Sequence, residues 1–532
     1  VNDLVVPVNV DTVMLSNIFD LDDDEQIKVI NGKYVLTDSG TFNSDPIDIE
    51  SFHLAKPSIA PTIKEIYSLP SSAVTVSDAE FPIASDPSTF MYESDNVSDY
   101  ILEIDSISAD IDLDVDITFI GLTPGQADLK VVDMAIQIPK GLVIEPEEGK
   151  TYDMRTGELR IAEAIGDGNV IHLNIKAVGI DFDMIGGIYD REASHIALRS
   201  EIYVKDGVLQ LSAIGGNTLP QQLSMRNDYS LNGFNVTEFS GRIHYEVDNL
   251  SVNDVELNDL PDFFSQNGTD LHLKDPQLYI NVVNPLENYD VYAESGLSIT
   301  TFGRDGSSVK RSIDNGIFRI PNTSASGEYN FCISPSAPTN PLAEYPNPLF
   351  VKFSTLGDVF SGNGLPSKLA IDLEPVVPDQ AVRNFALGSS IGTVNGKYKF
   401  YAPLELEKGS VVVYSDTVDG WSSEELDYLT ITKLEIKLNI SSDLPLKAQL
   451  TGYPIDVDGN RINGVSIEGA EIDAFAKDQA VTIYLTGEVK RLDGIVFTTR
   501  IKAEDVKTLT PDMEMSLKNI RPRVSGYYEK EL

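Results

Sequence analysis

The chain has 532 residues, of which 83 are acidic and 40 are basic, and its formal net charge is −43 at pH 7. A charge of this sign repels phosphate backbones and anionic membrane surfaces and attracts cations such as calcium, so nucleic-acid binding is disfavoured. The hydrophobic content of 42% supports several folded cores and is too high for a disordered chain. At ~150 residues per domain, the length predicts three or four domains.

The N-terminal region is predicted to form a small β-module over residues 1–60. Apolar and polar residues alternate over Ile27–Leu36, and Asn31-Gly32 within this stretch is a hairpin signal. Residues 61–94 are rich in proline and serine and are therefore predicted to be a linker. The sequence begins with valine, which we interpret as a mature chain whose leader has been removed.

Alternating stretches rich in Val, Ile, Tyr and Thr continue along the rest of the chain, with Gly, Asn and Asp between them. They predict strands at Ile101–Ile120, Leu129–Ile138, Val170–Ile175, Ser200–Leu211, Gly241–Val255, Leu271–Val283, Lys397–Tyr401, Val411–Tyr414, Leu429–Ile440, Ala480–Val489 and Gly494–Ala503. Short helical turns are expected only near Leu260–Gln266 and Ser422–Tyr428. The sequence thus predicts an all-β protein of tandem antiparallel β-sandwich modules with few or no long helices.

One strand phrase occurs twice, at Gln277–Leu286 and at Lys433–Leu446. In both places an alternating strand runs into a Pro-Leu corner and is followed by a second alternating stretch and a glycine turn. The phrase Asn-Gly-Lys-Tyr also occurs twice, at 31–34 and 395–398; we interpret both as hairpins and expect the N-terminal piece to pair with the last module. Repetition of strand-turn units favours tandem modules over a single enzyme core.

Proline-rich breaks and the expected size of ~150 residues per domain together guide the predicted module boundaries. One break lies at Ser334–Leu349 and another at Pro375 and Pro378. The predicted β-sandwiches therefore cover residues 95–240, 241–380 and 385–532.

Four aspartates, Asp110, Asp112, Asp114 and Asp116, alternate with apolar residues. A strand has a side-chain period of two, so all four carboxylates are expected on one face. This face is either a ladder that binds cations or, in the interpretation we prefer, the solvated outer face of a half-buried strand.

A second acidic candidate resembles the start of a calcium-binding loop. Asp456, Asp458 and Asn460 surround Gly459, and they are the candidate metal ligands. The glycine comes too early for the EF-hand spacing, so a hairpin turn is the preferred interpretation and calcium the alternative. No other cofactor is expected.

No catalytic motif is found. The histidines, none of which has zinc-site spacing, are His53, His172, His195, His244 and His272. The single cysteine, Cys332, lies in an apolar stretch and is expected to be buried. Because nucleotide-binding loops and nucleophile elbows are also absent, we predict a non-enzymatic protein, although paired carboxylates of a glycoside hydrolase would not stand out among 83 acids.

The only tryptophan, Trp421, lies in a polar stretch rather than in an apolar run. An exposed indole can stack on a sugar ring while nearby carboxylates bind its hydroxyl groups. Trp421, Asp419 and Glu424 are therefore the candidate ligand-binding residues. The alternative is a loop in which the tryptophan folds back over the end of a sandwich.

The chain resembles surface lipoproteins of gut Bacteroidetes. The phrases that carry this resemblance are Ala135–Ile144, Thr156–Ile161 and Asn284-Pro285-Leu286. The resemblance implies export to the bacterial cell surface or outer membrane, where an N-terminal lipidated cysteine, not seen in this sequence, anchors such proteins. It implies adhesion or capture of an extracellular glycan or of a host or bacterial surface protein. The alternatives are a structural subunit or scaffold of a surface assembly and a cryptic polysaccharide hydrolase.

Overall fold

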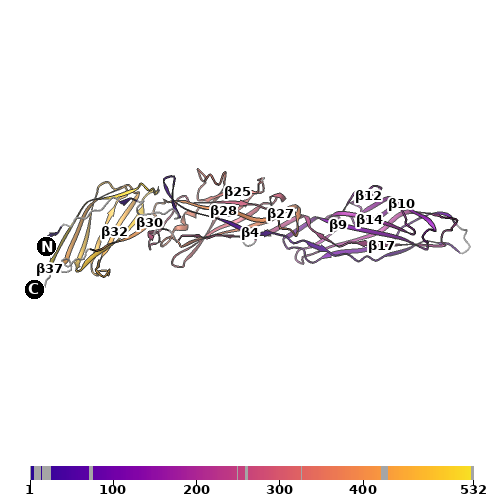
Figure 1. The fold of residues 1–532 in the computed structure, drawn as a ribbon, viewed down its shortest axis with the longest axis horizontal. Helices are drawn as coiled ribbons and strands as arrows, with labels where there is room; N and C mark the ends of the chain where they lie inside the picture. Colours follow the sequence, from indigo (N-terminus) through magenta and orange to yellow (C-terminus); the bar gives the residue numbers. More distant parts are fainter. Residues whose placement is uncertain are drawn as a thin grey trace.

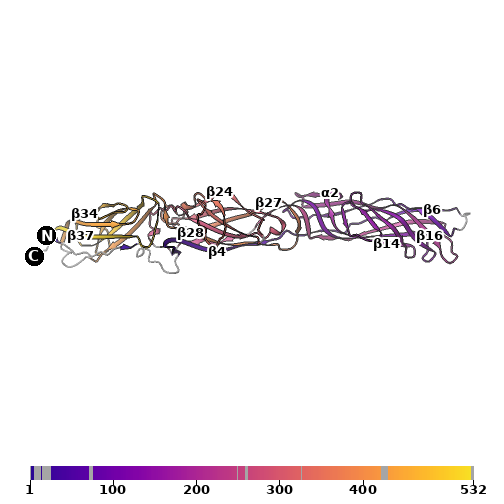
Figure 2. The same ribbon diagram turned by 90° about the horizontal axis from the view of Figure 1, so that it is seen from above.

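The computed structural model describes residues 2–4, 13–14, 26–70, 76–247, 250–257, 260, 262–324, 326–420 and 429–528. These residues form an elongated stack of three β-modules, which keeps a narrow outline in two perpendicular views (Figures 1 and 2). Among the described residues the longest helix, η3 (Leu356–Phe360), has five residues. The predicted all-β class without long helices is confirmed.

We call the three modules terminal, middle and distal. The terminal module contains both chain ends, because β1 (Asn2–Leu4) pairs with β37 (Glu514–Tyr528). The distal module lies at the opposite end of the stack, and the middle module lies between the two (Figure 1).

Each module repeats one antiparallel pairing scheme built from six strands. The first strand lies between the fourth and the sixth, and the second lies between the third and the fifth. In the distal module these strands are β9 (Ile101–Ile120), β10 (Ala127–Gln137), β13 (Glu158–Ile165), β14 (Val170–Asp181), β16 (His195–Ala213) and β17 (Gln222–Leu231). In the middle module they are β22 (Gln277–Val283), β23 (Ala293–Phe302), β24 (Ser308–Ile320), β25 (Glu328–Ser334), β27 (Lys368–Ala386) and β28 (Gly392–Pro403). In the terminal module they are β31 (Leu429–Ser442), β32 (Leu446–Asp456), β33 (Ser466–Ile472), β34 (Gln479–Val489), β35 (Leu492–Ala503) and β37.

The N-terminal segment adds a further strand beside the sixth strand of every module. β1 and β2 (Val13–Met14) pair with β37, β4 (Lys33–Ile47) pairs with β28, and β6 (Thr62–Ser68) pairs with β17. The chain therefore runs outward through all three modules and returns through them in reverse order. The modules are nested in the sequence: the distal module is inserted into the middle one, and the middle module into the terminal one.

This arrangement differs from the predicted boundaries. Residues 1–60 are predicted as a separate module, but β1, β2 and β4 join sheets of the terminal and middle modules, and β5 (Phe52–Leu54) pairs with β18 (Phe234–Val236). Residues 61–94 are predicted as a linker, but they contain β6, β7 (Asp78–Pro82) and β8 (Ser88–Ser94), which pair with β17 and β16. Proline and serine are compatible with these short edge strands, so composition alone did not separate a linker from strands.

The repeated phrases have different outcomes. The two long phrases begin in β22 and β31, which are the first strands of equivalent modules. Asn31-Gly32 forms the predicted hairpin, with φ of 52° and 75°. The prediction of a second hairpin at Asn395-Gly396 is wrong, because both residues lie inside β28. Glycine is needed there because a Cβ at position 396 would overlap the carbonyl oxygen of Asn281 on the neighbouring strand.

The distal and middle modules share one continuous sheet. β19 (Glu238–Glu246) pairs with β9 on one side and with β27 on the other. The predicted break at Pro375 and Pro378 instead lies within β27, where the strand changes its neighbour from β23 to β19. The register shifts opposite Pro378, and a bulge tolerates proline because no ladder donor is required there.

The hydrophobic core forms two main clusters. One cluster of buried side chains runs through the distal and middle modules and reaches Leu446, Ala503, Leu509 and Met513 in the terminal module. The buried side chains of β31, β33 and β34 form a separate cluster in the terminal module. The stack therefore has one long unit, made of the distal and middle modules, and one shorter unit that meets it at a joint.

Candidate functional site

The joint between the middle and terminal modules contains residues 269–274, which we call the bridging segment, beside direct backbone bonds such as that from Tyr34 N to Leu509 O at 3.2 Å. On one side it bonds to the middle module: Leu273 N donates to Gly357 O at 3.2 Å. On the other side it bonds to the terminal module: Asp270 and Val411 exchange backbone hydrogen bonds of 2.7 and 2.8 Å, and Glu407 N donates to His272 O at 2.8 Å. One extended segment thus holds both modules through its two edges.

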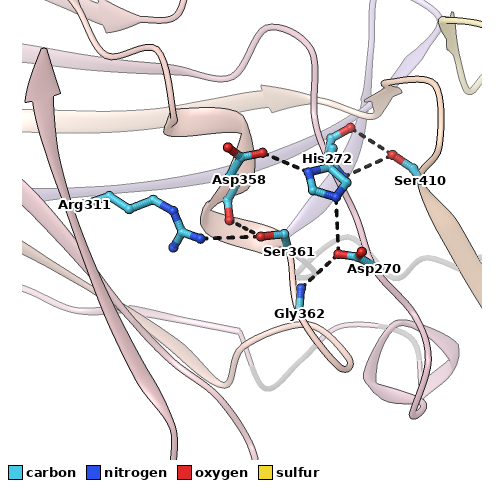
Figure 3. A network of polar contacts seen from close by, with 7 residues as sticks. All are labelled: Asp270, His272, Arg311, Asp358, Ser361, Gly362 and Ser410. Atoms are coloured by element: carbon cyan, nitrogen blue, oxygen red, sulfur yellow. Dashed lines mark hydrogen bonds and ion pairs between the residues drawn. The ribbon is translucent and has the colours of Figure 1, made fainter.

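His272 lies at the centre of this joint, between two carboxylates (Figure 3). Its Nδ1 is 2.8 Å from Oδ1 of Asp358, which belongs to η3 of the middle module. Its Nε2 is 3.4 Å from Oδ1 of Asp270, which also accepts a hydrogen bond of 3.0 Å from Gly362 N. The His272 side chain is 34% exposed, so water reaches the cluster.

The protonation state of His272 determines how many of these contacts are satisfied. A neutral imidazole has one N–H donor, whereas an imidazolium has two. Partial burial alone lowers the pKa of His272, but the hydrogen bond to Asp358 and the charges of Asp270 and Asp358 outweigh it, and the pKa is raised above its ordinary value of 6.5. The two carboxylates therefore favour the doubly protonated ring.

Two serine hydroxyls complete the network, and neither contacts the imidazole ring. Ser410 Oγ accepts a hydrogen bond from His272 N and donates one to His272 O, both at 3.1 Å. Ser361 Oγ donates to Asp358 O at 2.7 Å and accepts from Arg311 at 3.5 Å. Because both ring nitrogens face carboxylates, this geometry orients a charged histidine and does not activate a serine nucleophile.

The sequence did not single out His272 among the five histidines. Asp270 is two residues away, but Asp358 is 86 residues away and Ser410 is 138 residues away. The histidine thus has one local signal, the Asp-x-His spacing, and its remaining partners are supplied by the fold.

The predicted ligand-binding residues lie beyond β30 (Val411–Val418). Asp419 directly follows this strand and is exposed. Trp421 and Glu424 lie outside the described residues. Ligand binding by these three residues stays a prediction.

The predicted calcium ligands form a hairpin loop at the end of β32. Asp456 Oδ1 accepts backbone hydrogen bonds from Asp458 at 3.0 Å and from Asn460 at 2.8 Å, and the bond from Asn460 in particular lowers the pKa of Asp456. Asp458 faces Arg491 at 3.8 Å. These contacts agree with the hairpin interpretation. Within the described part of the chain, no group of three or more His, Cys, Asp or Glu side chains is placed to hold a metal ion.

The aspartate ladder of β9 lies on the outer face, as alternation predicts, while the residues between the aspartates are buried. Its carboxylates meet polar partners on the adjacent β14. Asp116 is 2.7 Å from His172, Asp114 accepts a 2.8 Å hydrogen bond from Asn174, and Asp112 is 4.0 Å from Lys176. The ladder is therefore a solvated row of cross-strand pairs.

No family model and no curated protein matches the chain. A solved structure described as "a putative secreted protein from Parabacteroides distasonis" is 14% identical with a TM-score of 0.37, and the alignment covers 55% of this chain and 90% of that one. A structure of Sulfolobus turreted icosahedral virus is 10% identical with a TM-score of 0.12, covering 88% of this chain and 91% of the other.

None of the helices in the described part of the chain has the length and the apolar character needed to span a lipid bilayer.

Proposed function

We propose that this is an exported, non-enzymatic protein displayed on a bacterial cell surface, where it serves in adhesion or ligand capture. The observation that supports this most is the position of the chain ends. Both lie in the terminal module, and the distal module lies at the far end of the stack (Figure 1). A molecule held near either end would present its distal module away from the attachment point.

A display function also requires a stiff stack. The 20-residue β9 alone spans roughly 65 Å at ~3.3 Å per residue. β19 connects β9 to β27, so the distal and middle modules are joined by hydrogen-bonded strands instead of a free linker. This construction keeps the distal module extended from the rest of the protein.

The partner we propose is an extracellular glycan or a surface protein, not a nucleic acid, because the net charge of −43 repels polyanions. Contact with a membrane would come only through an N-terminal lipid anchor. The proposed contact residues for a glycan are Trp421, Asp419 and Glu424, in which the indole stacks on a sugar and the carboxylates accept hydrogen bonds from hydroxyl groups.

The experiment is a glycan-array screen of the full chain, with and without calcium. The wild type is compared with Trp421→Ala and with Tyr528→Ala, which removes an aromatic side chain of β37 that is 48% exposed. The proposal predicts binding that Trp421→Ala removes and Tyr528→Ala retains, with the melting temperature of both variants unchanged. If no glycan binds with or without calcium, the proposed glycan partner is excluded, and a surface protein remains as the proposed partner.

A structural subunit of a surface assembly is the second candidate, and one edge strand favours it. β26 (Leu349–Lys352) lies at the edge of its sheet, where Leu349 is 44% and Phe350 is 43% exposed. An open, partly apolar edge can pair with a strand of another chain. Size-exclusion chromatography with light scattering tests this candidate: concentration-dependent association that Phe350→Asp abolishes supports it, and a monomer at high concentration contradicts it.

A further inference from the structure

We infer that His272 makes the joint between the middle and terminal modules sensitive to pH: the protonated ring holds Asp358 and Asp270 together, and the neutral ring releases one of them. The inference is independent of the proposed ligand, because it concerns how firmly one module is held on the next.

The first step is the position of the ring in the joint. The bridging segment bonds to β30 and its preceding loop through backbone groups on one edge. On the opposite edge, Leu273 N bonds to Gly357 O and His272 Nδ1 meets Asp358, and both partners are in η3. The His272–Asp358 contact is therefore a side-chain contact between the bridging segment and the middle module, in addition to the hydrogen bond from Gly362 N to Asp270 and the burial of Leu271 and Leu273 in the core.

The second step is the count of donors and acceptors. Two carboxylate oxygens face the two ring nitrogens, at 2.8 and 3.4 Å. A neutral ring donates to only one of them, and its other nitrogen then presents a lone pair to a carboxylate. Loss of the proton thus removes one attraction and creates one repulsion at the same place.

The third step is the set of charges around the ring. Asp358 faces it from η3, Asp270 faces it from the bridging segment, and Glu407 lies in the loop that bonds to His272 O. The nearby cations are engaged elsewhere: Lys274 pairs with Glu405 at 2.8 Å, and Arg311 contacts Ser361. The immediate surroundings are acidic and favour the imidazolium.

The direction of the pH effect follows from these contacts. The pKa of His272 is raised in the folded protein, so its contribution to the joint is fully present below about pH 6.5 and is lost as the pH rises through the raised value. The joint is therefore firmer in mildly acidic solution and looser in alkaline solution.

The test is hydrogen–deuterium exchange of the full chain at pH 6.0 and 8.5. At each pH the wild type is compared with His272→Gln, so that the intrinsic pH dependence of exchange cancels. The matched control is His195→Gln in the distal module, which removes a histidine that faces a single carboxylate, Asp95, at 2.7 Å. We expect His272→Gln to increase exchange in peptides covering residues 269–274 and 356–361 several-fold at pH 6.0 and by a smaller factor at pH 8.5.

The same difference at both pH values, or an equal effect of His195→Gln, would overturn the inference. A second measurement remains available if His272→Gln does not fold. An NMR titration of the five histidines in the wild type should give His272 a midpoint above 6.5, and Asp358→Asn should lower that midpoint. A midpoint at or below 6.5, or one that Asp358→Asn leaves in place, would also overturn it.

Discussion

Replacing Phe385 with alanine tests whether the distal and middle modules form one cooperative unit. Phe385 is fully buried in β27, directly opposite Phe239 of β19. Its ring lies 6.0 Å from Phe239 and 4.7 Å from Tyr289, measured between ring centroids. These contacts are at the place where the shared sheet passes from the middle to the distal module.

The expected loss of unfolding free energy is large. Truncating a buried phenylalanine to alanine costs about 3–5 kcal/mol, because apolar contacts are lost and a cavity is left. Each aromatic pair contributes about 0.5–1.5 kcal/mol to stability beyond the burial of apolar area. Because Phe385 forms two such pairs, we expect a loss of unfolding free energy in the upper part of the range of about 3–5 kcal/mol. A cooperative unit is stable by about 5–15 kcal/mol, so the substitution removes a substantial fraction.

The assay is urea denaturation followed by hydrogen exchange, with peptides from β9 and from β23 as reporters of the two modules. Both sets of peptides should lose protection together, because sheet and core are continuous across them. The control is Phe350→Ala, in which a 43% exposed side chain is removed from an edge strand and the change should stay within about 0.5 kcal/mol. A loss below about 1 kcal/mol for Phe385→Ala, or a loss confined to one module, would refute the reasoning.

Three further substitutions probe individual positions. Gly396→Ala should cost about 1–3 kcal/mol in urea denaturation because its Cβ meets a neighbouring backbone, whereas Gly296→Ala, whose Cβ would meet Glu374 Oε2 at 3.4 Å, should be nearly neutral; equal costs would contradict the close approach. Burial raises the pKa of Asp38, so the charged carboxylate destabilises the folded state once the pH rises above this raised pKa. Asp38→Asn should therefore raise the urea midpoint more at pH 7 than at pH 3. An equal change of the urea midpoint at both pH values would contradict this. Asp456→Ala should lower the unfolding free energy by no more than about 1 kcal/mol through loss of its turn hydrogen bonds; a melting temperature that calcium raises in the wild type but not in the variant would instead establish a calcium site.

Local patterns explain which parts of the fold could be predicted. The alternation over Ile101–Ile120 coincides with β9 because a strand with one buried face has a period of two in its own sequence. The repeated phrase likewise identified β22 and β31 as equivalent, because the pattern of each strand is visible in its own sequence. The pairing of β4 with β28 has no such signal, because any exposed strand edge offers the same backbone donors and acceptors. Proline likewise predicted a break at Pro375 and Pro378, where a change of neighbour and a bulge accommodate it.

The candidate site was less predictable than the fold. Asp456 could be placed in a turn because Asp-Gly and Gly-Asn are local turn signals. His272 could not be distinguished from the other histidines, since its environment depends on Asp358 and Ser410, which reach it only after the modules have packed.

The nested order of the strands also sets the order in which the modules can be completed during synthesis. Ser44 in β4 bonds to Val394 in β28, 350 residues later, which corresponds to roughly 20–70 s at ~5–20 residues per second. The strands of the distal module are all available first, those of the middle module next, and those of the terminal module last. The N-terminal strands β1 and β4 therefore keep unpaired edges until their partners have been synthesised. The ladder between β1 and β37 forms only after the last strand has been made.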